Sequence, residues 1–343
     1  MPELRKDPVI GRWVIIAKER GRRPSDFKAS SEHRDVHLCP FCEGNEDKTP
    51  PEILSYRSDP GAPNTSGWKV RAIPNKFPVL EIEGDIHRAG VGMYDMMNGI
   101  GAHEVIVESP KHVVNFIDLS GDQIELILKA YRERLKDLYK DKRFRYIIIS
   151  KNYGLAAGAI LSHSHSQLIA MPIVPRTVRS ELKAAKQYYL NKERCVFCDM
   201  MKQELSSGER IIATNDHFVV LAPFASRFPF EMCLMPKKHS HRFHDITDEE
   251  IGSLASILIK VMSKLKSILG DPAYNIMVHT APNELPRLGH PEYWSSLSHD
   301  YHWHFEIMPR LIEVAGFEWG TGLYINSIAP EDAALHLREG MNV

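Results

Sequence analysis

Two stretches of the chain have the hydrophobic spacing of an amphipathic helix. After Ser120 and Gln123, and again after Thr247 and Glu250, apolar residues recur three or four positions apart. A serine or threonine three residues before Gln or Glu is typical of the capping box at a helix N-terminus. We therefore predict one helix in each stretch and expect the second to end at Gly270.

Other segments alternate apolar with polar residues or form short apolar runs, as β-strands do. They read HEVIVES, RYIIIS, SHSHSQLIAMP, EMCLMP, YNIMVH and HWHFEIMP. Their short or helix-containing connections favour antiparallel sheet with helices on one face. The order also repeats: a C-x-x-C pair, a strand ending near a histidine, a helix, a strand, and a strand with H-x-H. This predicts an α+β fold of two fused halves, residues 1–172 and 173–343, each an antiparallel sheet packed by helices.

Composition narrows the class of protein. The chain has 343 residues, is 43% hydrophobic, and carries 43 basic and 44 acidic residues for a net charge of -1. This balance is typical of a folded globular protein and gives no basic field for nucleic acid. No apolar run is long enough to span a membrane, and the first residues do not resemble a signal peptide, so we expect a cytoplasmic protein. Its five cysteines then suggest free thiols or metal ligands instead of disulfides.

Four of these cysteines form two C-x-x-C pairs, and each half also has histidines at matching places. The predicted zinc sets are Cys39, Cys42, His112 and His163 in the first half and Cys195, Cys198, His239 and His302 in the second. Two thiolates and two imidazoles are a ligand set that zinc prefers. The alternative is a redox pair, but a thioredoxin-like context is lacking. Four protein ligands leave no position for water, which favours structural zinc.

The strand with H-x-H-x-Q has three polar side chains at alternate positions. Residues i, i+2 and i+4 of a strand share one face, so His163, His165 and Gln167 are expected to point the same way. One imidazole can bind metal while the next acts as nucleophile or base. The neutral amide of Gln167 can donate to a phosphate oxygen.

The CPFC, SPKH and H-x-H-x-Q motifs and the duplicated layout resemble the galactose-1-phosphate uridylyltransferase branch of the histidine triad superfamily, over nearly the whole chain. The resemblance implies that His165 is the covalent nucleophile and His163 a zinc ligand, and that Gln167 contacts the transferred phosphoryl group. That family typically has His-Pro-His where this chain has His163-Ser164-His165. The serine resembles a subgroup that includes plant-type ADP-glucose phosphorylases.

The resemblance also implies residues that bind substrate, together with a homodimer. Arg20 and Arg23 would hold the diphosphate. Phe41, Asn75 and Phe77 would line the base and ribose, and Asn152 would bind phosphate. Phe317 and Glu318 would contact the sugar phosphate across a dimer interface. Phe317 replaces the family's tyrosine.

In the second half, the corresponding H-x-H strand has Glu306 where the first has Gln167. A carboxylate would repel phosphate, so we expect a mainly structural second half and one active site per chain. Relatives without the second C-x-x-C can bind metal with residues that map to Glu181, His279, His302 and His304. Iron is the alternative to zinc at the second site. We favour the cysteine set and expect Glu181 on a helix surface.

These inferences predict a nucleotidylyltransferase that works by ping-pong kinetics through a nucleotidyl-histidine. The first choice is UDP-glucose with galactose 1-phosphate as acceptor, giving glucose 1-phosphate and UDP-galactose. The alternative is an ADP-glucose phosphorylase, with inorganic phosphate as acceptor. A nucleotide hydrolase and a zinc-knuckle binding protein are the remaining alternatives. The hydrolase would use water as the acceptor, and the zinc-knuckle protein would bind its ligand without turnover.

Overall fold

A computed structural model describes residues 1–343 except 21–26, 28, 31–37, 59, 287–290 and 341–343. The strands are β1 (Glu3–Lys6), β2 (Trp13–Ile16), β3 (Ala29–Ser30), β4 (Leu54–Arg57), β5 (Trp68–Pro74), β6 (Ala89–Val91), β7 (Tyr94–Met96), β8 (Ala102–Val107), β9 (Tyr146–Tyr153), β10 (His165–Met171), β11 (Ile211–Thr214), β12 (Phe218–Leu221), β13 (Met232–Pro236), β14 (Gly270–Asp271), β15 (Tyr274–His279), β16 (His304–Pro309) and β17 (Tyr324–Asn326). The α-helices are α1 (Gly121–Leu138), α2 (Arg176–Lys192), α3 (Val196–Ser207), α4 (Asp248–Leu269), α5 (Leu297–Asp300), α6 (Gly316–Thr321) and α7 (Pro330–Glu339). Short 3-10 helices are η1 (Lys18–Arg20), η3 (Glu46–Lys48), η4 (Phe116–Asp118), η5 (Leu155–Ala157), η6 (Phe243–Asp245) and η7 (Pro291–Trp294).

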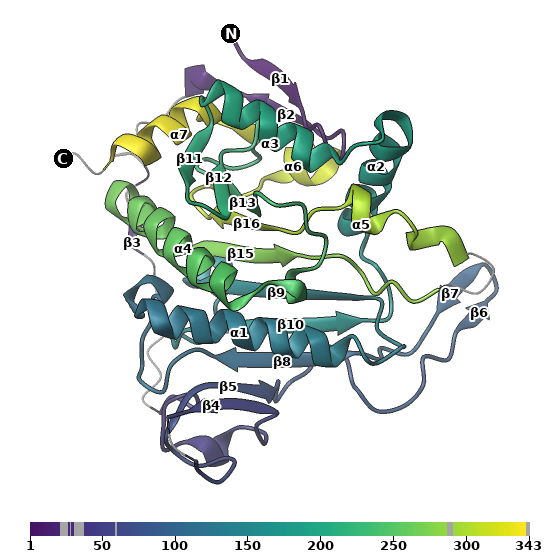
Figure 1. Ribbon diagram of the computed structural model, residues 1–343, viewed down its shortest axis with the longest axis vertical. Coiled ribbons are helices and arrows are strands. Elements are labelled where there is room, and N and C mark those ends of the chain that lie inside the picture. The colour runs from purple at the N-terminus through teal and green to yellow at the C-terminus, as the bar shows by residue number, and fades with distance from the viewer. Residues whose placement is uncertain (21–26, 28, 31–37, 59, 287–290, 341–343) are drawn as a thin grey trace.

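One ten-stranded sheet runs through the molecule in the order β11-β12-β13-β16-β15-β9-β10-β8-β5-β4 (Figure 1). Its neighbouring strands are antiparallel. The first half of the chain supplies the strands from β9 to β4, and the second half supplies those from β15 to β11. The halves meet where β9 pairs with β15, with Asn152 opposite Asn275. The predicted α+β class is confirmed, and the two half-sheets form one continuous sheet.

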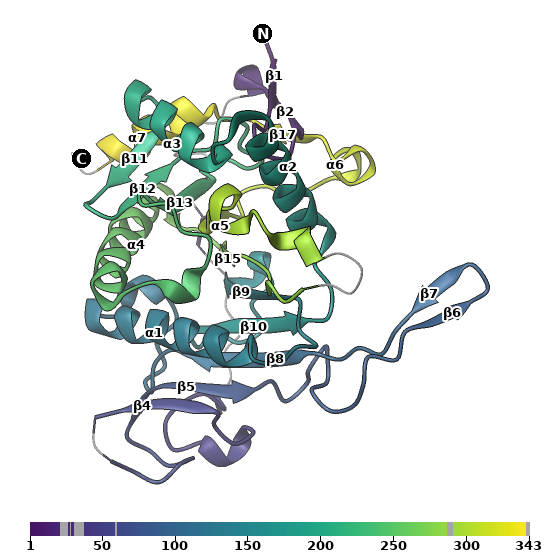
Figure 2. The same ribbon diagram turned by 45° about the vertical axis from the view of Figure 1, so that its right-hand side comes forward.

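Helices α1 and α4 lie side by side over one face of this sheet (Figures 1 and 2). Thr247 and Glu250 form the predicted capping box of α4, which ends at Leu269 before Gly270. Ser120 caps α1, but the side chain of Gln123 instead donates to the carbonyls of Lys69 and Glu108. The core beneath both helices joins the two halves and includes Ile127, Leu128, Ile149, Leu168, Leu258, Val261, Val278 and Phe305.

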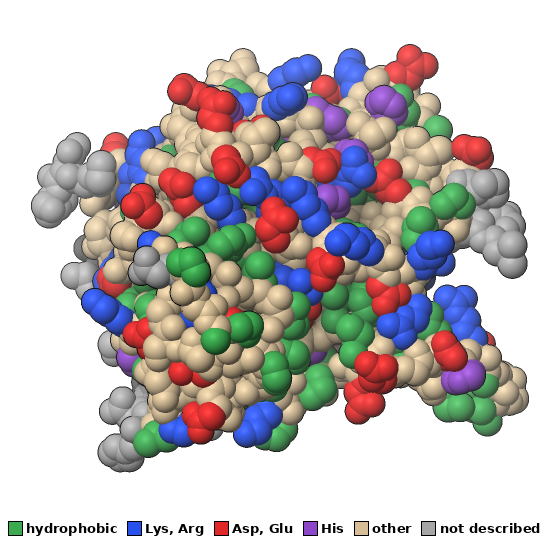
Figure 3. Space-filling view, turned by 60° about the horizontal axis from the view of Figure 1, so that its bottom comes forward, with side chains coloured by type: hydrophobic (Ala, Val, Ile, Leu, Met, Phe, Trp, Pro, Cys, Tyr) green, Lys and Arg blue, Asp and Glu red, His purple; other side chains and the backbone are tan. Residues whose placement is uncertain are grey.

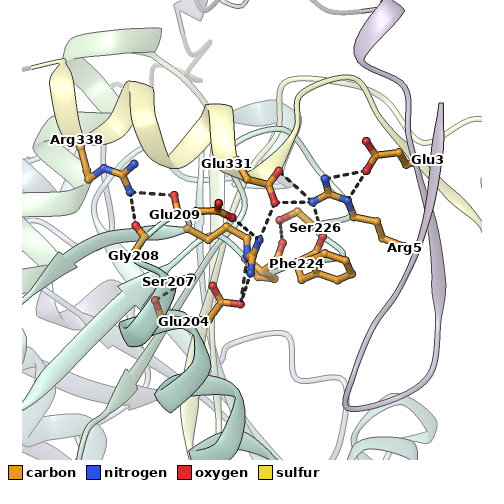
Figure 4. Close-up of polar contacts among 12 residues, drawn as sticks. Glu3, Arg5, Glu204, Ser207, Gly208, Glu209, Phe224, Ser226, Glu331 and Arg338 are labelled. Atoms are coloured by element: carbon orange, nitrogen blue, oxygen red, sulfur yellow. Dashed lines mark hydrogen bonds and ion pairs between the residues drawn. The ribbon is translucent and has the colours of Figure 1, made fainter. Parts of the chain in front are cut away.

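Elements near the N- and C-termini of the chain meet on the second half. Strand β2 pairs antiparallel with β1 and parallel with β17. The Glu331 carboxylate of α7 lies between the Arg5 and Arg210 guanidiniums, 2.7 and 2.8 Å away (Figure 4). Both arginines are 8% exposed, so this carboxylate ties β1 and α7 to the body of the fold.

The β6–β7 hairpin projects from the rest of the molecule (Figure 2). Its apolar side chains Val91, Met93, Tyr94 and Met96 are largely exposed. Figure 3 shows basic and acidic side chains interspersed over one face of the protein. Among the described residues, no helix is both long and apolar enough to cross a membrane.

Candidate active site and metal centres

The first Cys/His set comes from three segments, one before β4, one after β8 and one just before β10. The Sγ of Cys39 lies 3.5 Å from Nδ1 of His163, and the Sγ of Cys42 lies 3.4 Å from Nδ1 of His112 and 3.6 Å from that of His163. Zinc–sulfur and zinc–nitrogen bonds of about 2.3 and 2.1 Å at a tetrahedral angle separate sulfur from nitrogen by about 3.6 Å. The spacing therefore fits zinc.

The outward nitrogens of the two histidines have polar partners, and the partner of His163 fixes the tautomer that zinc needs. Nε2 of His163 lies 2.7 Å from the carbonyl of Ser109, and Nε2 of His112 lies 3.2 Å from the Ser162 hydroxyl. A carbonyl only accepts hydrogen bonds, so the neutral His163 ring carries its proton on Nε2 and presents a lone pair on Nδ1. Burial lowers the pKa of His163 to about 4, which keeps this ring neutral.

The second Cys/His set repeats this geometry beside α3. Nδ1 of His239 and Nδ1 of His302 lie 3.4 and 3.5 Å from Sγ of Cys198, and Cys195 completes the set. Nε2 of His302 donates to the carbonyl of Pro236 at 2.8 Å. Both predicted sets thus exist as clusters that fit a tetrahedral metal such as zinc, held by four protein ligands with no place for a reacting water.

A third cluster corrects the expectation for Glu181. This residue is buried, not on a helix surface, because α2 packs it against the sheet. Its carboxylate lies 3.0 Å from Nδ1 of His279 and 3.3 Å from Nε2 of His304. Burial lowers the pKa of His279, but Glu181 and Glu306 outweigh it and raise that pKa to about 9. Three of the four alternative ligands therefore meet here, while His302 belongs to the cysteine set.

His165 begins β10 on the face opposite α1 and α4. Its Nδ1 lies 2.7 Å from the carbonyl of His163, so Nδ1–H donates and the lone pair of the neutral ring lies on Nε2. Burial lowers the pKa of His165 and favours this neutral form. Among the described residues, Nε2 has no hydrogen-bond partner, and the Phe41 ring packs edge-on against the imidazole at 5.3 Å. An imidazole held this way can act as a nucleophile through Nε2.

Gln167 lies on the same face and is oriented by His103, a residue that the sequence analysis missed. The backbone N–H of Val79 donates to Nδ1 of His103 at 3.2 Å, so the ring proton lies on Nε2. Nε2–H then donates to Oε1 of Gln167 at 2.8 Å. The amide NH2 of Gln167 has no partner among the described residues and is available to a phosphate oxygen.

Two asparagines predicted to bind substrate lie near these groups. Oδ1 of Asn75 accepts from the backbone N–H of Phe77. Nδ2 of Asn75 is 3.0 Å from Nε2 of His103, which bears the ring proton and so does not accept from that amide. The Phe77 side chain is 81% exposed. Asn152 lies on β9, where its Oδ1 accepts from Nδ2 of Asn275 at 2.7 Å.

The remaining predicted residues are the two arginines and the C-terminal pair. Arg23 lies outside the described residues. Arg20 is the last residue of η1, and the structure describes its backbone but not its side chain. Phe317 and Glu318 belong to α6, which lies over the second half and away from β10 in Figures 1 and 2. The Phe317 side chain is half exposed, and the Glu318 carboxylate accepts from the backbone N–H of Ala315.

Comparison with known proteins identifies the family. The sequence profile described as "Galactose-1-phosphate uridyl transferase, N-terminal domain" matches residues 1–175, and the profile for the C-terminal domain of the same enzyme matches residues 181–341. The chain belongs to the galactose-1-phosphate uridyl transferase family. Members of this family are nucleotidyltransferases of carbohydrate metabolism, and this protein is an enzyme of that class.

Relatives within the galactose-1-phosphate uridyl transferase family differ in their nucleotide. The ADP-glucose phosphorylase of Arabidopsis thaliana is 39% identical over 98% of this chain and 93% of its own length. The galactose-1-phosphate uridylyltransferase of Thermotoga maritima is 28% identical over 99% and 98%. A crystal structure of the Arabidopsis thaliana phosphorylase with bound ADP-glucose superposes with a TM-score of 0.79 at 36% identity, covering 99% of each chain.

Proposed function

We propose that this enzyme transfers a nucleotidyl group from a nucleotide sugar through a covalent intermediate on His165. One observation carries the proposal: the hydrogen bond from Nδ1–H of His165 to the His163 carbonyl directs the lone pair of Nε2 away from its own strand. The free amide NH2 of Gln167 lies two positions further along the same strand face. A nucleophile beside a neutral donor suits attack on a phosphoryl group.

The proposed reaction has two displacements. In the first, Nε2 of His165 forms a bond to the α-phosphorus while the bond to the bridging oxygen breaks, and the sugar 1-phosphate leaves with that oxygen. The proton on Nδ1 stays on the ring and is held by the His163 carbonyl. In the second, an oxygen of the acceptor phosphate bonds to phosphorus and the P–N bond breaks. Gln167 would donate to the phosphoryl oxygens in both steps.

The two Cys/His clusters would hold zinc, which in the first cluster would be a structural anchor. When bound there, it would fix His163, whose carbonyl accepts the proton of His165. Cys39, Cys42 and His112 would supply the other ligands. The chemistry itself needs only the imidazole, the amide and phosphate-binding donors.

Two nucleotide sugars are candidates for the donor. Adenylyl transfer from ADP-glucose to inorganic phosphate is supported by the 39% identity to the Arabidopsis thaliana phosphorylase and by the His163-Ser164-His165 sequence. Uridylyl transfer from UDP-glucose to galactose 1-phosphate is supported by the family profiles and by the Thermotoga maritima relative. We give the adenylyl reaction first place and propose that the enzyme is a homodimer.

Intact mass spectrometry would test this function. We expect the purified protein, mixed with ADP-glucose, to gain one adenylyl group per chain and to lose it when phosphate is added. The His165→Ala variant should gain none. His217→Ala, which changes a histidine paired with Glu249 at 3.4 Å on the second half, is the control and should react as the unchanged protein does.

The outcomes separate the candidates. A uridylyl adduct from UDP-glucose that galactose 1-phosphate discharges would establish the second donor instead of the first. An adduct that water alone removes would indicate a hydrolase. An adduct that persists in His165→Ala would place the nucleophile elsewhere, and no adduct with either donor would refute the proposal.

A further inference from the structure

A buried polar network lies under the strand that carries His165. It occupies the face of the sheet covered by α1. Ser164 and Ser166 point to this face, and His165 and Gln167, which alternate with them along the chain, point to the other. Lys151 of β9 and Glu108, just after β8, are 3% and 0% exposed and form an ion pair at 2.5 Å. A buried charge pair seldom stabilises a fold more than apolar packing would, so its presence here needs another reason.

The network is fully satisfied and centred on the two serines. The Glu108 carboxylate accepts from Lys151, from Ser164 at 2.6 Å, from Ser166 at 2.5 Å and from Tyr131 at 3.3 Å. The three protons of the Lys151 ammonium also have three acceptors. They are Glu108, the Ser164 hydroxyl at 2.9 Å and the backbone carbonyl of His165 at 3.3 Å.

The contact with the His165 carbonyl replaces a missing part of the sheet. The pairing of β10 with β9 starts at Gln167, opposite Ser150, and does not extend to His165. The Lys151 side chain reaches that carbonyl from the neighbouring strand instead. The carbonyl of Ser164, the residue before His165, accepts from the backbone N–H of Glu108 at 3.2 Å. Both peptide groups around the nucleophile are thus held by Lys151 and Glu108.

We infer that Lys151 and Glu108, acting through Ser164 and the His165 carbonyl, are positioning residues that set the direction of His165 Nε2 for nucleotidyl transfer. The inference rests on the proposed function. The pair touches no substrate, because it lies on the opposite face of the sheet from His165. Removing it should slow the formation of the nucleotidyl-histidine without changing how much enzyme can react.

The test compares single-turnover kinetics of the zinc-loaded protein with ADP-glucose and, separately, UDP-glucose. The double variant Lys151→Met/Glu108→Gln removes both charges and leaves neither unpaired. We expect its rate constant for adduct formation to fall at least fivefold at saturating donor. The final adduct per chain, the zinc content and the KM for donor should each stay within twofold of the unchanged protein.

Glu204→Gln is the matched control. Glu204 is a buried carboxylate, 3% exposed, that pairs with Arg210 at 2.9 Å in the second half. We expect its rate constant to stay within twofold of the unchanged protein. A fivefold loss in this variant would show that any buried carboxylate has the same effect, and would overturn the inference.

The remaining outcomes are also decisive. A double variant with less than fivefold slowing overturns the positioning role, as does one with a lower final adduct but an unchanged rate constant. If the double variant does not fold, Ser164→Ala is tested instead, because it removes one contact of each charged residue. At least threefold slowing of adduct formation in this variant supports the inference, and a smaller effect overturns it. Absence of adduct in the unchanged protein would instead refute the proposed function.

Discussion

His103 offers the sharpest test of how the site orients Gln167, the side chain that would donate a hydrogen bond to the phosphoryl group. It is buried, at 7% exposure, and its Nε2–H holds Oε1 of Gln167 while its Nδ1 accepts from the backbone of Val79. In a His103→Ala variant, the Gln167 amide loses the contact that selects one of its two flipped orientations. Its NH2 would then face the phosphoryl group only part of the time, and adduct formation should slow.

The size of the effect follows from the lost bond. A hydrogen bond between neutral groups contributes about 0.5–1.5 kcal/mol, which corresponds to a roughly 2- to 13-fold loss of the productive orientation. Removing the donor itself is more severe, because loss of one group that stabilises transition-state charge costs about 10²–10³-fold in rate. We therefore expect His103→Ala to slow adduct formation roughly 2- to 13-fold and Gln167→Ala to slow it about 10²–10³-fold.

A double-mutant cycle in single-turnover experiments at saturating donor measures the coupling. If His103 acts through Gln167, adding His103→Ala to Gln167→Ala should cause no further loss, because the group being oriented is already absent. The surface variant His217→Ala serves again as the control. A double variant whose slowing equals the product of the two single effects would refute the reasoning, since His103 would then act independently of Gln167.

Three further predictions concern metal content and stability. Cys195→Ser should lower bound zinc from about two to about one per chain in elemental analysis, because the second cluster loses a thiolate. Thr247→Ala should remove the side-chain cap of α4 at a cost of about 1 kcal/mol, which lowers the apparent Tm by roughly 1–2 °C for a chain of this length. Glu331→Gln should cost about 1–2 kcal/mol at pH 7 and lower the apparent Tm by roughly 1–3 °C. Burial raises the pKa of Glu331, but hydrogen bonds from Arg5 and Arg210 outweigh it and lower that pKa. The stability is thus present above the unfolded pKa and is lost as pH falls through the lowered value, so the Tm difference should shrink below about pH 4.

The features that the sequence predicts well depend on short-range patterns. The capping pairs and apolar spacing place α1 and α4, because a helix is determined by residues three and four apart. The metal clusters are found because C-x-x-C occurs twice with matching histidines. Glu181 was within reach of the same reasoning: Val178, Glu181, Leu182 and Ala185 all lie on the buried stripe of α2. The glutamate at a buried position was the missed signal.

Features that depend on which strands become neighbours could not be predicted. His103 and Gln167 are 64 positions apart, and their contact exists only because β8 pairs with β10. The pair of Lys151 and Glu108 likewise requires β9 and β8 to flank β10 on either side. Strand alternation predicts the face on which each side chain lies but not its partner across the sheet. The joining of the two half-sheets at β9 and β15 has the same origin.

The two halves show how one architecture can carry a proposed active site and a counterpart that is unsuited to the same reaction. In each, the second histidine of H-x-H donates through Nδ1 to the carbonyl of the first, at 2.7 Å for His165 and 3.1 Å for His304. The backbone thus prepares both rings in the same way. However, Nε2 of His304 faces the Glu181 carboxylate at 3.3 Å. Glu306, at the position of Gln167, is bound by the Arg227 guanidinium at 2.8 Å. Two carboxylates beside the ring repel an anionic phosphoryl group, and the Glu181 carboxylate occupies the space in front of the nitrogen that would attack it. Glu181 on α2 and Glu306 on the histidine strand itself, not a change in the histidines, therefore account for one proposed active site per chain.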